Sequence, residues 1–411
     1  MKKHSVSFEE AQKRALELAS LVELSAEWVN VLDALGRTAC SDVICTKNLP
    51  SYNNAAMDGF AFKYDENNKY LRIKKRILAG DVSAPCLDKY ECYKIMTGAK
   101  VPDDADTIIP FEECAFYDDA SVELSLHVKK GNALRCKGEE QTCGTVLIQK
   151  GEVLNSTSIA LLASQGMMHV EVYRKLKIAI LSTGDELKKP WEHATEDEIY
   201  DVNAFALIAL LKEQGFDAVY GGVVPDNLDV ATRYFQTMMT YDVLVTSGGV
   251  SMGEADFVEQ ALMTNGFEPS FHGIEIKPGK PTMMGKMSRT IVASMPGNPL
   301  AAYVNAFLFL VPLLKKAQGQ INFNFSFQNV LHGTPLKLKK GRVNLILGSV
   351  IDGYFEAYDN NRYGSGMIKP LLSSTSILIS DEKRDCFEKD EVVKIISFKA
   401  FFTSEKKHLI N

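Results

Sequence analysis

The middle of the chain alternates short apolar runs with segments of helical spacing. Runs that fit buried strands cover residues 177–181, 218–224, 243–246, 274–276 and 291–294. Between them, residues 202–211 and those from 228 to about 239 carry apolar side chains at helical spacing. Alternating strands and helices predict an open, mainly parallel α/β sheet in this region.

The flanking regions have different patterns. Residues 7–24 have helical spacing, with Ser7 as the N-cap and Glu10 completing a capping box. Residues 71–153 consist of short apolar runs between turn residues, which is typical of a small barrel or sandwich. Short β runs return after residue 320 and predict a second small β domain.

Polar side chains stand at the ends of the strands predicted in the α/β region. The loops carry hydroxyl, acidic or basic groups and read Ser182-Thr-Gly-Asp-Glu-Leu187, Pro225-Asp-Asn227, Ser247-Gly-Gly-Val-Ser-Met-Gly-Glu-Ala-Asp256, Lys277-Pro-Gly-Lys-Pro281 and Met295-Pro-Gly-Asn-Pro-Leu300. In an open parallel sheet, ligands bind at the carboxyl edge of the strands. These loops therefore predict one binding cleft.

The loop after residues 243–246 is the richest in glycine. Its small and hydroxyl residues are Ser247, Gly248, Gly249, Ser251 and Gly253. Glycine lets the backbone approach an anion, and amides and hydroxyls donate hydrogen bonds to it. Asp256 at the end of the loop fits either a metal ion beside a phosphate or a helix cap. Taken alone, the loop is either an anion site or a structural connection.

Two asparagines lie at helix starts. Asn203 either caps the helix at residues 202–211 or binds a ligand. Asn298 is a natural N-cap, with Pro299 at the first position of the helix that runs to Leu314.

The polar loops of the first β region fit ordinary turns. Asp58 precedes Gly59, and an Asp-Gly pair is usually just a turn. Residues 96–99 place a hydroxyl beside a glycine, and residues 135–140 combine basic and acidic groups. Each is more often a solvated loop than a site, so this region alone predicts no chemistry.

Composition narrows the class of protein. The 411 residues are 46% hydrophobic and 24% charged, as in ordinary globular proteins. A net charge of -6 argues against a broad nucleic-acid or membrane-surface footprint. No apolar run reaches a membrane-span length, and the N-terminus leads into an amphipathic helix, so we expect a cytoplasmic protein. The 8 cysteines form no Cys-x-x-Cys pair and are expected to be reduced thiols.

Taken together, the motifs resemble one known family. They are Ala56-Met-Asp-Gly-Phe-Ala61, Met96-Thr-Gly-Ala99 and the strand-end loops from Ser182 to Pro299, in the order found in the MoeA/gephyrin E-domain family. These proteins are molybdopterin molybdenumtransferases. The resemblance implies a multidomain α/β plus β fold: a MogA-like α/β molybdopterin-binding domain, an inserted β domain, a split linker domain and a C-terminal β domain. The implied boundaries are residues 1–46 and 147–175 for the linker, 47–146 for the insert, 176–320 for the α/β domain and 321–411 for the last domain.

The resemblance also implies a reaction. Adenylylated molybdopterin and molybdate would give molybdenum cofactor and AMP, with Mg²⁺ as the divalent cation. The dithiolene sulfurs of the pterin supply soft ligands for molybdenum, so the protein need not provide cysteines. The implied assembly is a homodimer that receives its substrate from a MogA-type adenylyltransferase, with no nucleic-acid or membrane partner.

Site residues follow by resemblance. The implied catalytic residues are Asp58, Thr97, Glu186, Asp226 and Asp256, with Glu186 and Asp256 holding the metal. Asp58 and Thr97 are expected to face the cleft of the other subunit. The implied substrate-binding residues are Ser182, Thr183, Gly184, Asp185, Ser247, Gly248, Gly249, Ser251, Gly253, Lys277, Lys280, Pro281, Pro296, Gly297, Asn298, Pro299, Arg342 and Ser365. Those on the molybdate side are Lys277, Lys280, Pro281, Arg342 and Ser365.

Two segments depart from the family pattern, and two other functions compete. Glu140 stands where the family commonly has aspartate, and the segment beginning Gly341-Arg342 lacks the usual aromatic residue and second arginine.

A pterin- or nucleotide-binding scaffold is one alternative function, although several carboxylates facing a phosphate give a pure anion binder no advantage. An adenylyltransferase that builds the activated pterin is the other.

Overall fold

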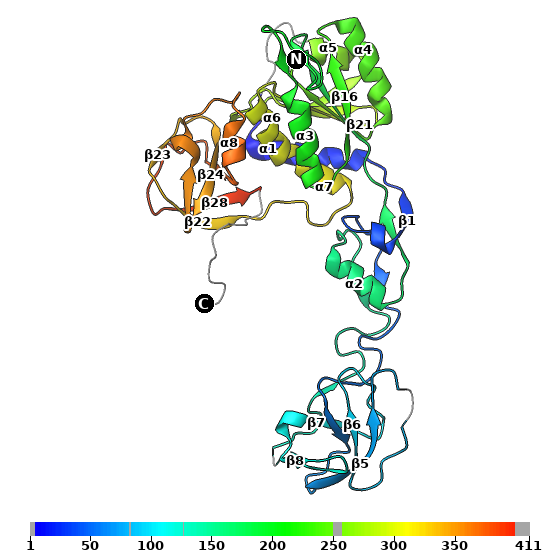
Figure 1. Cartoon of the computed structure of the whole chain (residues 1–411). Coiled ribbons are helices and arrows are strands. Elements are labelled where there is room, and N and C mark those ends of the chain that lie inside the picture. The colour runs from blue at the N-terminus through cyan, green and yellow to red at the C-terminus, as the bar shows by residue number, and fades with distance from the viewer. Residues whose placement is uncertain (1–4, 82–83, 126, 250–256, 399–411) are drawn as a thin grey trace.

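The computed structural model shows an elongated chain of distinct parts (Figure 1). It describes residues 5–81, 84–125, 127–249 and 257–398. An α/β body, residues 178–317, lies at one end with the C-terminal β domain beside it, and a narrow linker connects the body to the inserted β domain at the far end (Figure 1). The predicted multidomain α/β plus β fold is confirmed.

The α/β body is built on a six-stranded sheet with the order β16-β13-β17-β21-β20-β18. The strands β16, β13, β17 and β21 are parallel, whereas β20 and β18 are antiparallel. The bounds are β13 Ile178–Thr183, β16 Ala218–Val224, β17 Val243–Ser247, β18 Phe267–His272, β20 Met283–Met287 and β21 Thr290–Met295. Every residue of β13, β17 and β21 is buried, which explains the apolar runs that form most of each strand.

The strand expected at residues 274–276 does not join this sheet. Instead β19, Ile276–Lys277, pairs in parallel with β24, Val343–Ile351, of the C-terminal domain. A short apolar run indicates that a strand is buried but does not identify the strand with which it pairs, and here that partner lies far along the chain. The loop at residues 277–281 therefore lies where the α/β body meets the C-terminal domain.

Helices cover both faces of the sheet. Ile180 and Val245 point to a core shared with α1, α3, α6 and α7, whereas Leu181 and Leu244 point to a core shared with α4 and α5. Successive side chains of a strand point to opposite faces of the sheet, and here both faces are buried. The helices are α1 Phe8–Leu18, α3 Val202–Glu213, α4 Leu228–Thr237, α5 Phe257–Thr264, α6 Pro299–Asn305, the π-helical segment Ala306–Leu310 and α7 Val311–Ala317.

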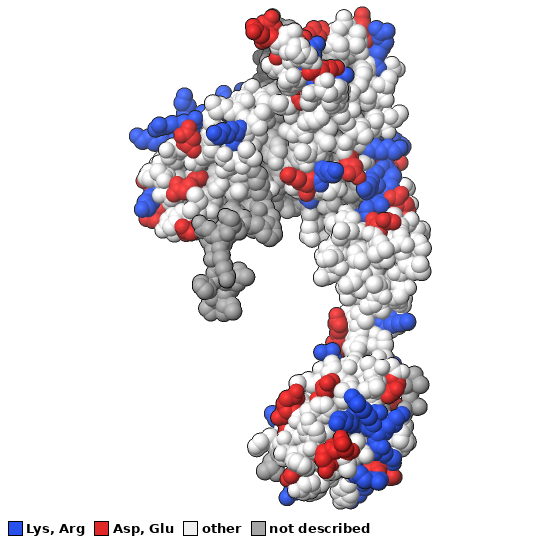
Figure 2. All heavy atoms as spheres, viewed as in Figure 1, with Lys and Arg blue, Asp and Glu red and all other residues white. Residues whose placement is uncertain are grey.

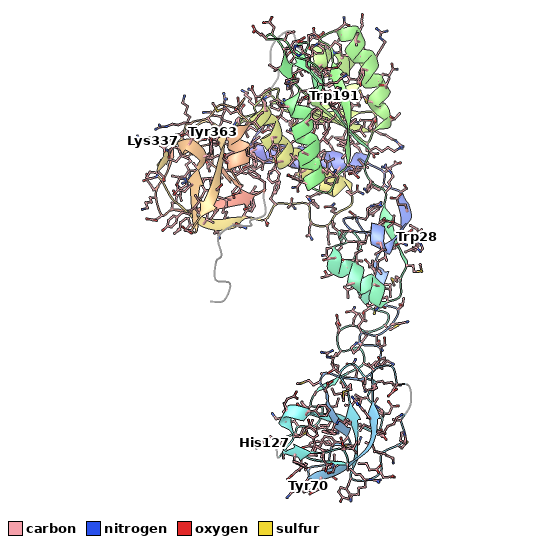
Figure 3. All side chains as sticks on the ribbon, viewed as in Figure 1. Trp28, Tyr70, His127, Trp191, Lys337 and Tyr363 are labelled. Carbon is pink, nitrogen blue, oxygen red and sulfur yellow. The ribbon has the colours of Figure 1, made fainter. Side chains whose placement is uncertain are left out.

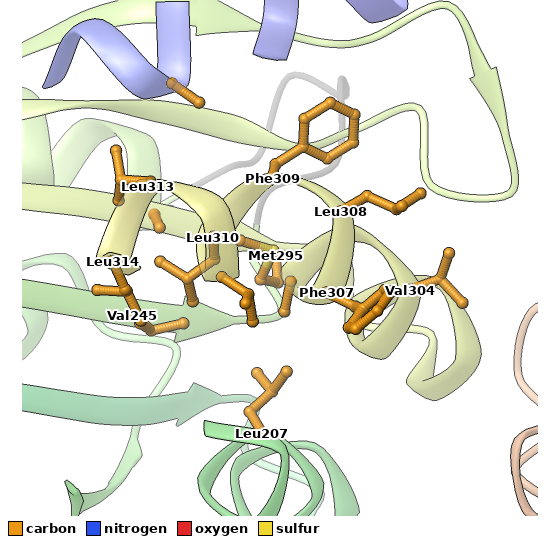
Figure 4. Packing of buried hydrophobic residues seen from close by; sticks show 14 of the residues in the cluster. Leu207, Val245, Met295, Val304, Phe307, Leu308, Phe309, Leu310, Leu313 and Leu314 are labelled. Atoms are coloured by element: carbon orange, nitrogen blue, oxygen red, sulfur yellow. The ribbon is translucent and has the colours of Figure 1, made fainter. Parts of the chain in front are cut away.

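The last of these helices form one continuous stretch, Pro299–Ala317, of 19 residues. By length and composition it is apolar enough to cross a membrane, but 83% of its most apolar window is buried inside the protein. Leu314 lies beside Val245 of the sheet, and Phe309 packs edge-to-face on Phe8 of α1 at 5.3 Å between ring centroids (Figure 4). The stretch is the core helix of the α/β body.

The N-terminal helix α1 belongs to this core. Ser7 caps it as expected and accepts a hydrogen bond from the amide of Glu10 at 3.2 Å. The predicted capping box is wrong, because the Glu10 carboxylate accepts from Arg14 Nε at 2.6 Å instead. Arg14 also donates to the carbonyl of Ser270 at 2.8 Å. The boundary of the split linker at residue 46 stays a prediction, but α1 packs on the α/β body.

The linker is a small two-layered unit. Its strands β1 and β12 pair antiparallel, as do β2 and β11, and helix α2 packs on them. A bidentate ion pair from Arg174 to Asp242, at 2.7 and 2.8 Å, fastens the end of β12 to the start of β17. The bounds are β1 Ala26–Asn30, β2 Val43–Ile44, β11 Val146–Ile148, α2 Ser156–Ser164 and β12 His169–Tyr173.

The inserted domain holds a six-stranded sheet with the order β7-β4-β6-β5-β9-β8. Its core includes Phe60, Tyr93 and Ile108, all fully buried. The bounds are β4 Gly59–Phe62, β5 Tyr70–Ile77, β6 Glu91–Ile95, β7 Thr107–Pro110, β8 Phe116–Tyr117 and β9 Ser121–Glu123, with the pair β3 Asn54–Ala55 and β10 Leu134–Arg135 at the linker end.

The C-terminal domain is built on a third six-stranded sheet, with the order β19-β24-β25-β22-β28-β26. Because β19 comes from the α/β chain segment, this sheet is joined directly to the body. The remaining bounds are β22 Gln328–His332, β23 Leu336–Lys337, β25 Tyr354–Ala357, α8 Lys369–Ser373, β26 Ser376–Ile379, β27 Cys386–Phe387 and β28 Val392–Ser397.

Candidate active site

A cavity of about 550 Å³ opens at the carboxyl edge of the parallel strands. The loops that follow β13, β16, β17 and β21 all contribute to its wall, as expected for an open α/β sheet. Its polar and glycine lining residues are Thr183, Gly184, Glu186, Tyr200, Asp201, Asn203, Asp226, Ser247, Gly248, Gly249, Gly297, Asn298 and Gly366. We call this the strand-end cleft.

Asn203 connects three loops of the cleft. Its Nδ2 donates to Ser247 Oγ at 2.8 Å and to the carbonyl of Gly297 at 2.7 Å. The N-cap of α3 is instead Asp201, which accepts from the amide of Ala204 at 3.1 Å. Of the two interpretations of Asn203, capping is therefore wrong.

Two glycines of the cleft lie close to neighbouring loops. Gly248 and Gly249 have φ of 92° and 60°, a region that L side chains rarely adopt. A Cβ on Gly249 would lie 2.2 Å from Cγ2 of Val258, and one on Gly248 would lie 2.7 Å from the carbonyl oxygen of Thr183. Only glycine allows the loop to pack this tightly against β13 and α5.

Three carboxylates gather at the acidic side of the cleft. The amide of Asp226 donates to Asp185 Oδ1 at 3.0 Å. Burial raises the pKa of Asp226, and the negative charges of Asp185 and Glu186 raise it further. Such mutual repulsion favours a cation among these groups. Within the described ranges, no three histidine, cysteine, aspartate or glutamate side chains lie close enough to hold a metal by themselves.

A second cavity of about 370 Å³ lies between the α/β body and the C-terminal domain. Its charged lining residues in the described part of the chain are the cations Lys277, Lys280 and Arg342. Its polar lining residues are Asn344, Asn361, Tyr363 and Ser365. Figure 3 shows Tyr363 on the side of the C-terminal domain that faces the body. We call this the cationic pocket.

Asn305 of α6 holds the loop that carries the two lysines. Its Nδ2 donates to the carbonyl of Gly279 at 2.8 Å and to Thr282 Oγ1 at 2.6 Å. Asn305 is fully buried. The core helix therefore fixes the position of one wall of the cationic pocket.

The two cavities are neighbours, and two hydrogen bonds to Ser365 lie between them. Asn298 Nδ2 donates to Ser365 Oγ at 2.9 Å, and the amide of Leu300 donates to the carbonyl of Ser365 at 3.1 Å. Asn298 occupies the N-cap position before Pro299, but its side chain makes no capping hydrogen bond. It joins the strand-end cleft to the C-terminal domain instead.

Asp58 and Thr97 form a separate pair on the inserted domain. The amide and the hydroxyl of Thr97 both donate to Asp58 Oδ1 at 2.7 Å. These hydrogen bonds, first from the amide and then from the hydroxyl, lower the pKa of Asp58. Both side chains are exposed. Within one chain, the inserted domain that carries this pair lies at the opposite end of the molecule from the α/β body (Figure 1).

Known proteins resemble the chain over nearly its whole length. Residues 6–166 match the model of the MoeA N-terminal region, domains I and II, and residues 179–316 match that of a probable molybdopterin binding domain. The molybdopterin molybdenumtransferase of Haemophilus influenzae is 30% identical over 403 residues, covering 96% of this chain and 98% of the relative. The chain belongs to the MoeA family of molybdopterin molybdenumtransferases.

Other relatives agree with this membership. The Nostoc molybdopterin molybdenumtransferase is 30% identical over 368 residues, or 86% of this chain and 84% of the relative. A structure of the MoeA protein from Pyrococcus horikoshii superposes with a TM-score of 0.77 at 26% identity, covering 97% of this chain and 100% of that one. The resemblance inferred from the motifs is confirmed.

For this member of the MoeA family, the structure brings most predicted residues into the two cavities. The strand-end cleft receives Thr183, Gly184, Glu186, Asp226, Ser247, Gly248, Gly249, Gly297, Asn298 and Pro299, and the cationic pocket receives Lys277, Lys280, Pro281, Arg342 and Ser365. Ser182 and Pro296 are buried behind the cleft lining, where Ser182 Oγ donates to Asp201 at 2.7 Å and the Pro296 carbonyl accepts from Ser247 at 3.2 Å. Asp185 is exposed and does not line the cleft, but its Oδ1 accepts from the amide of Asp226, which does. Ser251, Gly253 and Asp256 lie outside the described residues.

The sequence prediction missed two residues that shape these sites. Asp201 accepts from Ser182 and caps α3, and Asn305 holds the lysine loop. Asp201 precedes the helix as a good N-cap would, so its position was a detectable signal. Asn305 lies inside an apolar helix, where a polar residue must find a partner, but the sequence does not identify that partner.

Proposed function

We propose that this chain inserts molybdenum from molybdate into adenylylated molybdopterin and releases AMP. The observation that carries this proposal is the contact of Asn298 with Ser365, which places an amide- and carboxylate-lined cleft next to a pocket of three cations. A nucleotide-bearing pterin and an oxyanion need two such adjoining sites. The membership of the MoeA family agrees with this assignment.

The strand-end cleft is the proposed site for the adenylylated pterin. Gly248 and Gly249 let a phosphate approach the backbone of this loop closely, and the Gly249 amide suits a phosphate oxygen. The Gly248 amide and the Ser247 hydroxyl donate to the carbonyls of Met295 and Pro296 and hold the loop in place. Asn203 keeps this loop against the Gly297 loop, so the Gly249 amide stays oriented before the substrate arrives. Orientation fixed in advance lowers the barrier, because no reorganisation is needed during the reaction.

The cationic pocket is the proposed molybdate site. Lys277, Lys280 and Arg342 neutralise the dianion, and the hydroxyl of Ser365 provides a further hydrogen bond. The two dithiolene sulfurs then bind molybdenum while one oxide of molybdate leaves as water with the two thiol protons, and a water molecule cleaves the phosphoanhydride bond between the pterin phosphate and AMP. The chain has only to hold the two substrates side by side.

A divalent cation, which we take to be Mg²⁺, fits the acidic side of the cleft. Glu186 and Asp226 line the cavity, and their carboxylate oxygens are the hard ligands that Mg²⁺ prefers beside a phosphate. The pKa of Asp226, raised by burial and then by its acidic neighbours, is consistent with a place for positive charge. Such an ion neutralises the pyrophosphate when bound. Asp256 remains part of this proposal, although it lies outside the described residues.

Asp58 and Thr97 are proposed to complete the cleft of a second copy. Their pair is preorganised and exposed on the inserted domain, which lies far from the strand-end cleft of its own chain. The linker offers a surface for dimerisation: Trp28, Leu32, Leu35 and Met168 are 63–80% exposed. Figure 2 shows few charged side chains on the visible face of the linker, and Figure 3 shows Trp28 projecting from it.

The proposed cellular context follows from the substrate. An adenylyltransferase of the MogA type would have to supply the adenylylated pterin, because nothing in the proposed reaction consumes ATP. We place the protein in the cytoplasm, without a nucleic-acid or membrane partner, which agrees with the net charge of -6 and the buried core helix.

The test is a reconstituted turnover assay. The full chain is incubated with adenylylated molybdopterin and Mg²⁺, and AMP is measured chromatographically with and without molybdate. We expect AMP release that rises with molybdate concentration and stops when the divalent cation is chelated. No AMP release at any molybdate concentration would contradict the proposal, and ATP consumption with molybdopterin alone would favour an adenylyltransferase.

A further inference from the structure

One carboxylate lies behind the cationic pocket and pairs with two of its cations. Glu275 Oε1 is 3.6 Å from Lys280 Nζ, and Glu275 Oε2 is 3.9 Å from Arg342 Nε. Lys280 and Arg342 line the pocket, whereas Glu275 is not among its described lining residues. The charged ends of both cations therefore have a competing anion outside the pocket.

These two ion pairs are weak enough to exchange. Both distances exceed hydrogen-bond length, and the three side chains are 33%, 36% and 48% exposed for Lys280, Glu275 and Arg342. Exposed ion pairs of this geometry contribute little to stability, because water and salt screen the attraction between the two charges. A dianion in the pocket carries twice the charge of one carboxylate, so it attracts the same cations more strongly at equal distance.

The third cation is not held in this way. Lys277 is exposed and has no ion pair among the residues that the structure describes. It is thus available to an incoming anion from the start, while Lys280 and Arg342 must leave Glu275. The pocket combines one free cation with two that are shared.

We propose that Glu275 is a built-in counter-ion that competes with molybdate for Lys280 and Arg342 and thereby sets the molybdate affinity of this chain. The inference rests on the proposed function for its choice of anion. Glu275 is a positioning residue that acts through Lys280 and Arg342 and touches neither substrate. It keeps the two cations paired when the pocket is empty and releases them when the oxyanion binds.

The side chain of Glu275 can be neutralised without disturbing the backbone. Its amide donates to the carbonyl of Val6 at 2.9 Å, and its carbonyl accepts from the amide of Val343 at 3.1 Å. Glu275→Gln retains both backbone bonds and nearly the same volume. A matched control is Glu268→Gln, which removes the exposed pair of Glu268 with Lys286, 3.1 Å apart, on the β18–β20 edge.

The experiment is titration calorimetry of the full chain with sodium molybdate, for the wild type and both variants. We expect Glu275→Gln to bind molybdate about two- to fivefold more tightly, the size that a weak exposed pair supports, and Glu268→Gln to match the wild type. Glu275→Ala should shift the affinity in the same direction. Equal or weaker binding by both Glu275 variants, or no molybdate binding by any protein, overturns the inference.

Turnover separates this inference from the proposed function. In the AMP-release assay, the KM for molybdate should fall by the same factor in Glu275→Gln, with kcat changing less than KM. If the wild type releases no AMP but Glu275→Gln binds molybdate more tightly, the proposed function fails and the counter-ion role stands. If AMP release is normal and Glu275→Gln leaves the KM unchanged, the counter-ion role fails and the function stands.

Discussion

The close packing of the glycine loop in the strand-end cleft gives a quantitative prediction for Gly249→Ala. An alanine at φ of 60° costs about 1–2 kcal/mol of backbone strain. Its Cβ would also lie 2.2 Å from Cγ2 of Val258 and 2.9 Å from Oγ1 of Thr183. Overpacking of this kind costs about 1–3 kcal/mol more, because Val258 is fully buried and has little room to move.

Gly215→Ala is the matched control. Gly215 follows α3 in the same α/β body and has φ of 87°, but no neighbouring atom lies within 4 Å of the position that an added methyl group would take. Alanine there carries the strain without the clash, so we expect Gly249→Ala to be less stable than Gly215→Ala by about 1–3 kcal/mol. Urea denaturation followed by circular dichroism measures the difference in unfolding free energy, provided that the two variants share one m value.

The same substitution should also weaken substrate binding. Displacing Gly249 moves the amide proposed to hold the phosphate, so the KM for the adenylylated pterin should rise in Gly249→Ala and stay unchanged in Gly215→Ala. If the two variants are equally stable and bind substrate equally well, the tight packing of this loop has no energetic consequence, and the reasoning is refuted.

Two further substitutions test other contacts. Asn305→Ala removes the hydrogen bond to the Gly279 carbonyl, so it should lower the unfolding free energy by about 1–3 kcal/mol and raise the KM for molybdate. An unchanged KM would show that the loop carrying Lys277 and Lys280 keeps its position without Asn305. For Asp242, burial raises the pKa, but hydrogen bonds from Arg174 and the Lys177 amide outweigh this effect and lower it. Its stabilisation is therefore complete above about pH 4 and is lost as the pH falls through the lowered folded-state pKa. Asp242→Asn should lose about 1–3 kcal/mol at pH 7, and urea midpoints that differ equally at pH 7 and pH 2 would contradict this.

The strands of the α/β body were largely predictable, because β13, β17 and β21 are buried along their whole length and the partly exposed edge strand β16 also carries an apolar run. The predicted strand at residues 218–224 coincides with β16, and β17 extends the prediction for residues 243–246 by one residue, Ser247. Continuous apolar runs of this length, bounded by turn residues, are typical of strands buried on both faces. The partner of β19 was not predictable, because pairing Ile276 with Val343 depends on tertiary packing rather than on local pattern.

The residues of the site were predictable from motif order, but their hydrogen bonds were not. Asn298 fits an N-cap by sequence, yet its side chain reaches Ser365 on another domain. Glu10 completes a capping-box pattern, yet Arg14 one turn later offers a charged partner. Local sequence rules indicate which hydrogen bonds a side chain can form, whereas the tertiary structure determines which partner lies close enough to form one.

The central claim, that the strand-end cleft is completed by the inserted domain of a second copy, is tested most directly by mixed dimers. Asp58→Ala and Glu186→Ala chains are produced separately and together, and molybdate-dependent AMP release is measured for each preparation. Each variant alone should be inactive. The co-produced mixture should regain about a quarter of wild-type activity, because half of the dimers are mixed and each has one intact cleft. A mixture as inactive as its parents, or near-normal activity in either variant alone, would contradict the account.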